Sequence, residues 1–131
     1  VNAAKRYTFT VPEREEMLRV VSADLGNVSV ANYTDRLLVA YATDGGFTHI
    51  VRGLRTADDF NAERTLQVFN HDHNPNITTV YIPCPRELDI VSSSMVKGLV
   101  GNDGWEEYAQ NYVHSFVLDG LRRVYAGRRS Q

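Results

Sequence analysis

Residues 48–82 have the sequence THIVRGLRTADDFNAERTLQVFNHDHNPNITTVYI, and this stretch decides the fold class. It begins with Thr48–Val51 and closes with Thr78–Ile82, two short segments rich in the β-branched residues that favour strands. Residues 57–72 between them favour a helix, and the sequence around Pro75 ends it. A strand, a helix and a second strand in this order predict a βαβ unit with a parallel sheet.

Helices are also predicted on the amino-terminal side of this unit. Thr10 and Glu13 form a capping-box pattern with a proline in the first turn, which predicts a helix from about residue 11 to residue 24. A short strand is expected at Val28–Val30 and a second helix over residues 35–43. The apolar residues expected to pack are Leu18, Val21 and Leu25 in the first helix and Phe60, Leu66 and Phe69 in the helix over residues 57–72.

The chain after the βαβ unit is predicted to be mainly helical. A loop over residues 83–91 precedes a short helix from Ser92 to Val100, and a glycine-bounded turn follows at residues 101–104. Residues 105–126 should be mostly helical, with Trp105 and Tyr108 as packing residues. The alternation of strands and helices predicts an α/β protein, and parallel sheets of this kind bind ligands at the carboxyl ends of their strands.

Length and composition restrict the function classes. The 131 residues predict a single domain with one core. A formal net charge of −2 does not favour a nucleic-acid partner or an anionic membrane surface. No apolar run approaches the ~20 residues that a membrane span needs. The one cysteine, Cys84, cannot form an internal disulfide, which favours a reducing compartment such as the cytoplasm.

The densest group of candidate functional residues lies where the first strand of the βαβ unit is predicted to end. Arg52 and Arg55 flank Gly53 there. Arginine binds phosphate oxygens through two parallel N–H donors, and glycine lets a ligand approach the backbone closely. On the local pattern alone, a solvated pair of surface arginines is an equally good interpretation.

A serine run at the start of the predicted helix from Ser92 is a second candidate. The hydroxyls of Ser92, Ser93 and Ser94, together with the free amides of a first helical turn, can bind an anion. Ordinary N-capping explains these serines as well, and from these residues alone it is the favoured interpretation.

Other polar residues have ordinary interpretations. Lys5 lies in a basic pair near the start of the sequence, and such pairs are most often solvated. His71 and His73 lack a further ligand at a metal-site spacing, so we expect a surface pair at a helix end. Cys84 has no nearby histidine and is not expected to be a nucleophile.

Five blocks of the sequence occur in the order found in one family of nucleotidyltransferases. They are KRYTFTVPER at residues 5–14, LGNVSV at 25–30, HIVRGLRTADDFNAE at 49–63, FNHDHNPNITTVYIP at 69–83 and VSSSMVK at 91–97. Together they resemble bacterial pantetheine-phosphate adenylyltransferase from about Asn2 to Lys97, with a looser fit beyond. This resemblance implies a Rossmann-like parallel sheet with helices on both faces.

The resemblance also implies an activity and a set of site residues. The family transfers the adenylyl group of ATP to 4′-phosphopantetheine, giving dephospho-coenzyme A and pyrophosphate, with Mg²⁺. Carried over by motif, Lys5 and Arg52 would be catalytic and would contact the substrate phosphate. The ATP-binding residues would be Gly53, Arg55, Glu63, Ser92, Ser93 and Ser94. The other substrate-binding residues would be Leu38, Leu66, Phe69 and Asn70.

General chemistry agrees with these implied roles. Adenylyl transfer needs alignment of the attacking and leaving oxygens and stabilisation of spreading negative charge. Lysine, arginine and helix-terminal amides supply that stabilisation, and no nucleophilic side chain is required. By analogy with the family, we expect a cytoplasmic homo-oligomer, specifically a hexamer.

The sequence also differs from the family pattern. The family's first strand, with its T-x-G-H motif, is absent from these residues, and none of the four histidines stands in a motif that could replace it. We therefore expect the natural protein to be longer. Milder differences are Ala62, Leu88, Asp89 and Gly98. Two alternatives follow: a non-catalytic nucleotide- or coenzyme A-binding homologue, and a related nucleotidyltransferase with a different acceptor.

Overall fold

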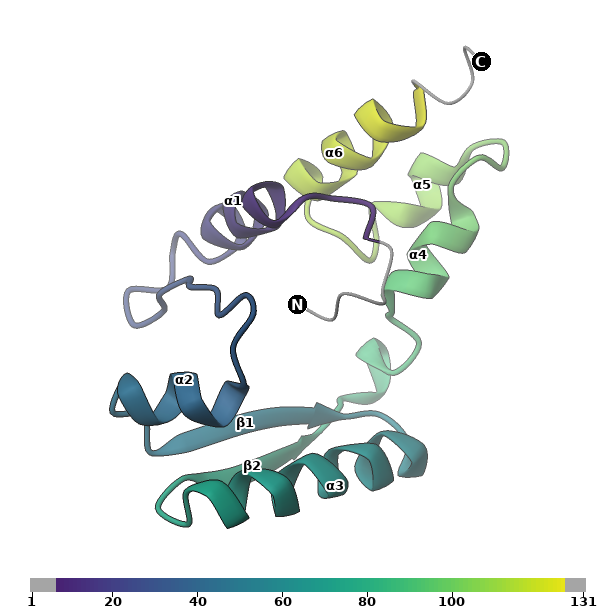
Figure 1. Cartoon of the computed structure of the whole chain (residues 1–131). Coiled ribbons are helices and arrows are strands. Elements are labelled where there is room, and N and C mark those ends of the chain that lie inside the picture. The colour runs from purple at the N-terminus through teal and green to yellow at the C-terminus, as the bar shows by residue number, and fades with distance from the viewer. Residues whose placement is uncertain (1–6, 127–131) are drawn as a thin grey trace. The chain divides into compact units, whose positions relative to one another are not determined.

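The computed structural model describes residues 7–126 (Figure 1). Its elements are α1 (Val11–Val21), α2 (Leu38–Asp44), β1 (His49–Leu54), α3 (Ala57–His73), β2 (Thr78–Pro83), the short 3-10 helix η1 (Arg86–Leu88), α4 (Ser93–Leu99), α5 (Trp105–Ala109) and α6 (Ser115–Ala126). These residues form two compact units by their contacts. We call residues 33–89 the α/β unit and residues 7–32 with 90–126 the helical unit. Within the described range, no helix combines the length and the apolar character needed to cross a membrane.

The α/β unit is built on a parallel pair of strands (Figure 1). Residue His49 pairs with Thr78 and Leu54 pairs with Pro83, so both strands are in register along their whole length. Helix α3 connects the strands, and α2 precedes them. The predicted α/β class with a parallel sheet flanked by helices is confirmed. Its buried core consists of Val39, Ala42, Ile50 and Ile77.

The two faces of the β1–β2 pair have different surroundings, because side chains alternate between faces along a strand. Ile50 is buried on one face, and Arg52 lies on that face beside its register partner Tyr81. On the other face Val51, Val80 and Ile82 are 58%, 38% and 52% exposed. The packed face is therefore the one that carries Arg52.

Strand β1 extends beyond its predicted end. Arg52 and Gly53 were expected just after the strand, but both lie within it, and Arg55 is the first arginine beyond it. The reason is the ladder with β2, which continues to Leu54 and is followed by a 2.7 Å hydrogen bond from the Cys84 amide to the Leu54 carbonyl. Because side chains alternate, Arg52 and Gly53 face opposite sides of the sheet.

The predicted strand at Val28–Val30 is wrong. These residues lie in the helical unit, and among the described residues none pairs with them as a strand. Alternating sequence alone does not form a strand, because the backbone groups need a neighbouring strand to bond to. The Val28 amide donates instead to the Leu25 carbonyl at 3.1 Å in a turn.

Most of the predicted packing residues of two helices are also wrong, although the half-exposed Phe60 still contacts the Tyr81 ring. In α1, Leu18, Val21 and the following Leu25 are exposed, whereas Met17 is buried. In α3, Phe60, Leu66 and Phe69 are exposed, and the buried residue is Asn70. Helical spacing identifies residues that share a face, but the neighbouring elements decide which face is covered.

The helical unit has its own core. Val96, Trp105, Ala109, Leu118 and Leu121 are buried together there, from α4, α5 and α6. Of the two residues predicted to pack, Trp105 is confirmed, whereas Tyr108 is 61% exposed and that prediction is wrong. Helix α6 approaches α1 closely at Gly120, where an added Cβ would lie 2.7 Å from Met17 Cε.

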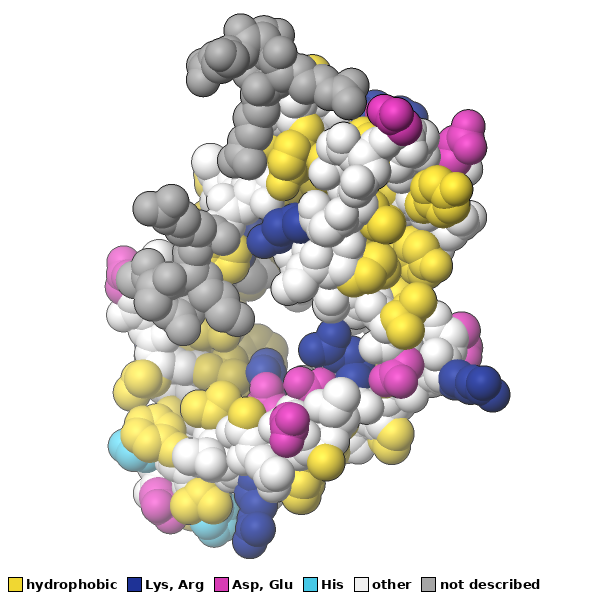
Figure 2. Space-filling view, turned by 90° about the vertical axis from the view of Figure 1, so that its right-hand side faces the viewer, with side chains coloured by type: hydrophobic (Ala, Val, Ile, Leu, Met, Phe, Trp, Pro, Cys, Tyr) yellow, Lys and Arg dark blue, Asp and Glu magenta, His cyan; other side chains and the backbone are white. Residues whose placement is uncertain are grey.

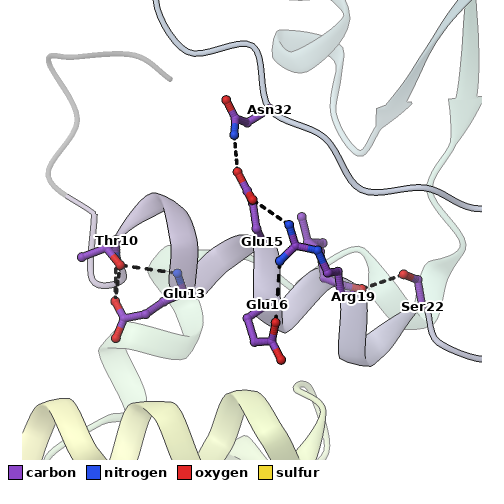
Figure 3. Close-up of polar contacts among 8 residues, drawn as sticks. Thr10, Glu13, Glu15, Glu16, Arg19, Ser22 and Asn32 are labelled. Atoms are coloured by element: carbon purple, nitrogen blue, oxygen red, sulfur yellow. Dashed lines mark hydrogen bonds and ion pairs between the residues drawn. The ribbon is translucent and has the colours of Figure 1, made fainter.

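Helix α1 begins with the predicted capping box (Figure 3). The Thr10 amide donates to Glu13 Oε2 at 2.7 Å, and the Glu13 amide donates to Thr10 Oγ1 at 3.4 Å. These hydrogen bonds with Thr10 hold the pKa of Glu13 below its ordinary value. Farther along, Arg19 pairs with Glu15 at 2.8 Å, and Asn32 donates to the same carboxylate.

The carboxyl-terminal helices are separated by a break that the sequence did not predict. Helix α5 ends at Ala109, and α6 begins at Ser115 after His114. The Phe116 amide donates to His114 Nδ1 at 3.2 Å, so this histidine satisfies a free amide at the start of α6. The predicted turn before α5 is confirmed, with φ values of 96° at Gly101 and 69° at Gly104 that favour glycine.

Candidate functional site

The strongest charge arrangement in the α/β unit joins β1 to α3. Arg52 Nε donates to Glu63 Oε2 at 2.7 Å, and Arg52 Nη2 donates to Glu63 Oε1. Both carboxylate oxygens thus meet one edge of the guanidinium, which is the bidentate geometry that makes arginine–carboxylate pairs strong. The side chain of Glu63 is only 17% exposed and that of Arg52 is 38% exposed. Chiefly because of the hydrogen bonds to Glu63, the pKa of Arg52 is raised.

A second arginine pair lies at the start of α3. Arg55 Nε and the Arg55 amide each lie 3.2 Å from Asp59 Oδ2. Thr56 caps the helix, with Oγ1 accepting from the Asp59 amide at 3.1 Å. The backbone and side-chain hydrogen bonds from Arg55 hold the pKa of Asp59 below its ordinary value. This pair is local, four residues apart, whereas the Arg52 pair connects two elements.

Figure 2 shows one face of the protein, on which dark blue basic and magenta acidic side chains lie next to one another. Interspersed charges of both signs bind a phosphate less strongly than a purely basic patch does. A phosphate bound beside these arginines would therefore have to accept hydrogen bonds from the N–H groups that do not bond to the carboxylates.

The remaining predicted residues of the α/β unit have different surroundings. Gly53 has open space beside it, since a Cβ added there would meet no described atom within 4 Å. Leu66 and Phe69 are exposed, Leu38 is half-buried against the α/β core, and Asn70 is buried. The structure thus brings Arg52 and Glu63 into contact, whereas Gly53 lies next to Arg52 in β1 and Arg55 lies between β1 and α3. Asn70 lies farther along α3, near its end.

The serines lie in the helical unit, where a cavity of about 390 Å³ opens beside α4. Ser92 is the N-cap of this helix, and its Oγ accepts from the Met95 amide at 3.1 Å. Ser92 and Ser93 line the cavity, whereas Ser94 is not among its lining residues. The capping interpretation therefore holds for Ser92, and a ligand role for the serines stays a prediction.

Arg14 is a cavity residue to which sequence reasoning gave no role. Its guanidinium carbon lies 4.2 Å from the centre of the Tyr7 ring, and both residues line the same cavity as Ser92. Within residues 7–126 its buried Nε has no hydrogen-bond partner. Two signals were available in the sequence: its place in the first turn of a capped helix, and its place at the end of the family-resembling block at residues 5–14.

Several other predictions concern this site. Lys5 lies outside the described residues, so its predicted role stays a prediction. Within the described range, no three His, Cys, Asp or Glu side chains form a group that could hold a metal ion. His73 Nδ1 contacts the Phe69 carbonyl at 2.7 Å, as a residue at a helix end.

A parallel βαβ unit is typical of Rossmann-like α/β proteins, and this fold is consistent with a nucleotidyltransferase. No protein-family model matches the chain. Individual relatives do. Phosphopantetheine adenylyltransferase of Chromobacterium violaceum is 41% identical over 126 residues, which cover 96% of this chain and 77% of that protein.

Two further relatives carry the same name. The enzyme of Neisseria meningitidis serogroup C is 45% identical over 123 residues, covering 92% of this chain and 71% of that protein. The enzyme of Streptococcus pyogenes serotype M5 is 39% identical over 99 residues, covering 76% and 61%. This chain therefore belongs to the phosphopantetheine adenylyltransferase family, a family of nucleotidyltransferase enzymes.

Proposed function

We propose that this protein transfers the adenylyl group of ATP to 4′-phosphopantetheine in coenzyme A biosynthesis. The observation that carries the proposal is the 41% identity over 96% of the chain to an enzyme of that name. The arrangement of Arg52 and Glu63 supports it, because it presents a fixed guanidinium near the end of a parallel strand. Ligands of α/β proteins bind at that edge of the sheet.

In the proposed reaction, a phosphate oxygen of 4′-phosphopantetheine attacks the α-phosphorus of ATP. A new phosphorus–oxygen bond forms, the bond from the α-phosphorus to the bridging oxygen breaks, and pyrophosphate leaves with that electron pair. The protein's part is to align the two oxygens and to stabilise the negative charge. We assign this to Arg52 with Lys5 on the acceptor phosphate, and to Arg55 and the serines Ser92, Ser93 and Ser94 on ATP.

Gly53 and Glu63 are proposed to line the nucleotide, and Leu38, Leu66, Phe69 and Asn70 to line the pantetheine arm. The exposed apolar side chains of Leu66 and Phe69 suit an uncharged arm, since they offer apolar surface to cover. Mg²⁺ fits a site in which the substrate phosphates supply most ligands, because it keeps several waters and needs few carboxylates. When bound, it would neutralise part of the phosphate charge.

The decisive experiment measures pyrophosphate release by the purified protein. We expect release that requires ATP, 4′-phosphopantetheine and Mg²⁺ together, and none with pantetheine, which lacks the phosphate. If the gene encodes residues ahead of Val1, the assay uses that longer form beside the 131-residue chain. Binding of both substrates without release would contradict the proposal and favour the non-catalytic homologue.

The same assay tests the choice of substrates. Nicotinate mononucleotide replaces 4′-phosphopantetheine as the acceptor in one reaction, and cytidine nucleotides replace ATP as the donor in another. Faster pyrophosphate release with one of these substrate pairs than with ATP and 4′-phosphopantetheine would favour a related nucleotidyltransferase.

The oligomeric state of the protein is a separate question. We propose a homo-oligomer, by analogy a hexamer, and size-exclusion chromatography with light scattering measures its mass; a monomer at assay concentration would contradict this.

A further inference from the structure

We infer that Glu63 is a positioning residue, whose carboxylate fixes the guanidinium of Arg52 so that the N–H donors outside this pair are held ready for a ligand phosphate. This inference rests on the proposed function and deepens it, because the family resemblance implies only a nucleotide contact for Glu63. It stands on the bidentate pair between β1 and α3 and on the contacts that hold those two elements together.

The geometry of the pair determines which donors remain. A guanidinium carries five N–H groups, and those of Nε and one of Nη2 point to Glu63. Two donors on Nη1 and the second on Nη2 lie outside this pair. Because the guanidinium is planar and rigid, fixing one edge also fixes the directions of the others. A phosphate that binds there would meet donors that are already oriented.

Three residues on one face of α3 contact this part of the sheet. Phe60, Glu63 and Gln67 follow a spacing of three and four residues, which places them on one side of a helix. The ring centres of Phe60 and Tyr81 lie 5.6 Å apart, and the Tyr81 hydroxyl donates to Gln67 Oε1 at 3.1 Å. Tyr81 is the register partner of Arg52. Contacts on both sides of Glu63 therefore fix its distance from Arg52.

The Arg52–Glu63 pair is less exposed to water than an ordinary surface ion pair. An exposed ion pair contributes little because water screens it and the side chains are free to move. Glu63 is largely shielded from water, so removing its partner or its charge changes the local geometry more than at an exposed site. The Arg55–Asp59 pair is more exposed and lies within one turn, and Asp59 therefore provides a matched control.

The test is a double-mutant cycle on binding, with two ligand pairs that differ in their phosphates. ATP is compared with adenosine, and 4′-phosphopantetheine with pantetheine, by calorimetry. We expect Glu63→Gln to weaken the phosphate-bearing ligands about tenfold or more, and adenosine and pantetheine by clearly less. In an Arg52→Ala background, Glu63→Gln should have no further effect, because its target is gone. Asp59→Asn should change these affinities less than Glu63→Gln does.

Two outcomes of the cycle would overturn the inference. Equal losses for ATP and adenosine would make Glu63 a direct ribose contact. Losses that simply add to those of Arg52→Ala would show that Glu63 acts independently of that arginine. Thermal melts of each variant verify that it is folded, and Glu63→Asp, which keeps the charge, should recover part of the affinity.

A second measurement needs no ligand. The Nε–H proton of Arg52 should give a slowly exchanging NMR signal in the unmodified protein, lost in Glu63→Gln and kept in Asp59→Asn. A rapidly exchanging signal in the unmodified protein would overturn the inference directly. If the protein binds neither ATP nor 4′-phosphopantetheine, the proposed function fails, and this signal still decides whether Glu63 positions Arg52.

Discussion

The two units of the molecule use their residues differently. The α/β unit has a core of four buried residues and an open sheet face, and its best-defined polar contact is the pair between Arg52 and Glu63. The helical unit packs residues from three helices around Trp105 and Ala109, and it brings α1 close to α6 at Gly120. One unit presents charge at a strand end, and the other supplies buried apolar contacts.

This difference bears on where substitutions should matter. Loss of a buried residue in the helical unit removes many contacts at once, because interiors are close-packed. In the α/β unit the two faces of one strand should respond differently, since only one is covered. Four predictions follow this contrast, from the largest expected change in the free energy of unfolding to the smallest.

Trp105→Ala should lower the free energy of unfolding by about 3–5 kcal/mol, because it removes a large buried side chain from the helical core. Urea denaturation measures the change. Tyr108→Ala on the same helix is the control, since Tyr108 is exposed, and its effect should stay within about 0.5 kcal/mol. Equal losses for the two variants would show that Tyr108 is covered in the native protein.

Ile50→Ala should cost about 2–5 kcal/mol, and Val51→Ala next to it should stay within about 0.5 kcal/mol. The two residues are neighbours on β1 but face opposite sides of the sheet. Chemical denaturation followed by circular dichroism compares them. A large loss for Val51→Ala would contradict the open face and show that another part of the assembled protein covers it.

Thr10→Ala and Thr56→Ala remove one helix cap from each unit, and each should cost about 1 kcal/mol. Comparing the two losses in stability shows whether the helix cap contributes equally in the helical unit and in the α/β unit. Thr65→Ala, at an exposed position inside α3, is the control and should be neutral or slightly stabilising. Thermal melts of the three variants decide the order, and a control as destabilising as the caps would refute the capping explanation.

Acid should weaken one contact in each unit. The pKa of Glu13 and that of Asp59 are lowered by hydrogen bonds in the folded chain. A carboxylate with a lowered pKa stabilises the fold above its unfolded pKa and loses that contribution as the pH falls through its folded pKa. Glu13→Gln and Asp59→Asn should therefore each reduce the fall in melting temperature between about pH 5 and pH 3. An unchanged slope in either variant would show that its hydrogen bonds contribute nothing measurable in solution.

Much of the local structure was predictable from the sequence. The Thr10–Glu13 capping box, the glycine turn before α5 and the β1–α3–β2 order all follow from short-range chemistry, which is encoded by a few neighbouring residues. Arg52, Gly53, Arg55 and Glu63 were also identified as site candidates, because their spacing resembles a family motif. The roles assigned to them remain predictions.

Other features depended on partners distant in sequence. Alternating residues at Val28–Val30 predicted a strand, but a strand exists only where another strand bonds to it. The helical spacing of Leu18 and of Leu66 was visible in the sequence, whereas the side from which each helix is covered was not. Neither the ion pair of Arg52 with Glu63 nor the buried Nε of Arg14 could be inferred from spacing.

By itself, the sequence determined the fold class, the β1–α3–β2 order and the family, because periodicity, caps and motifs are carried by nearby residues. Only the tertiary structure decided that Arg52 lies inside a strand, on the covered face, with its guanidinium held by a carboxylate from the next helix. The physical reason is that orientation and burial come from strand register and helix packing, which join residues far apart along the chain.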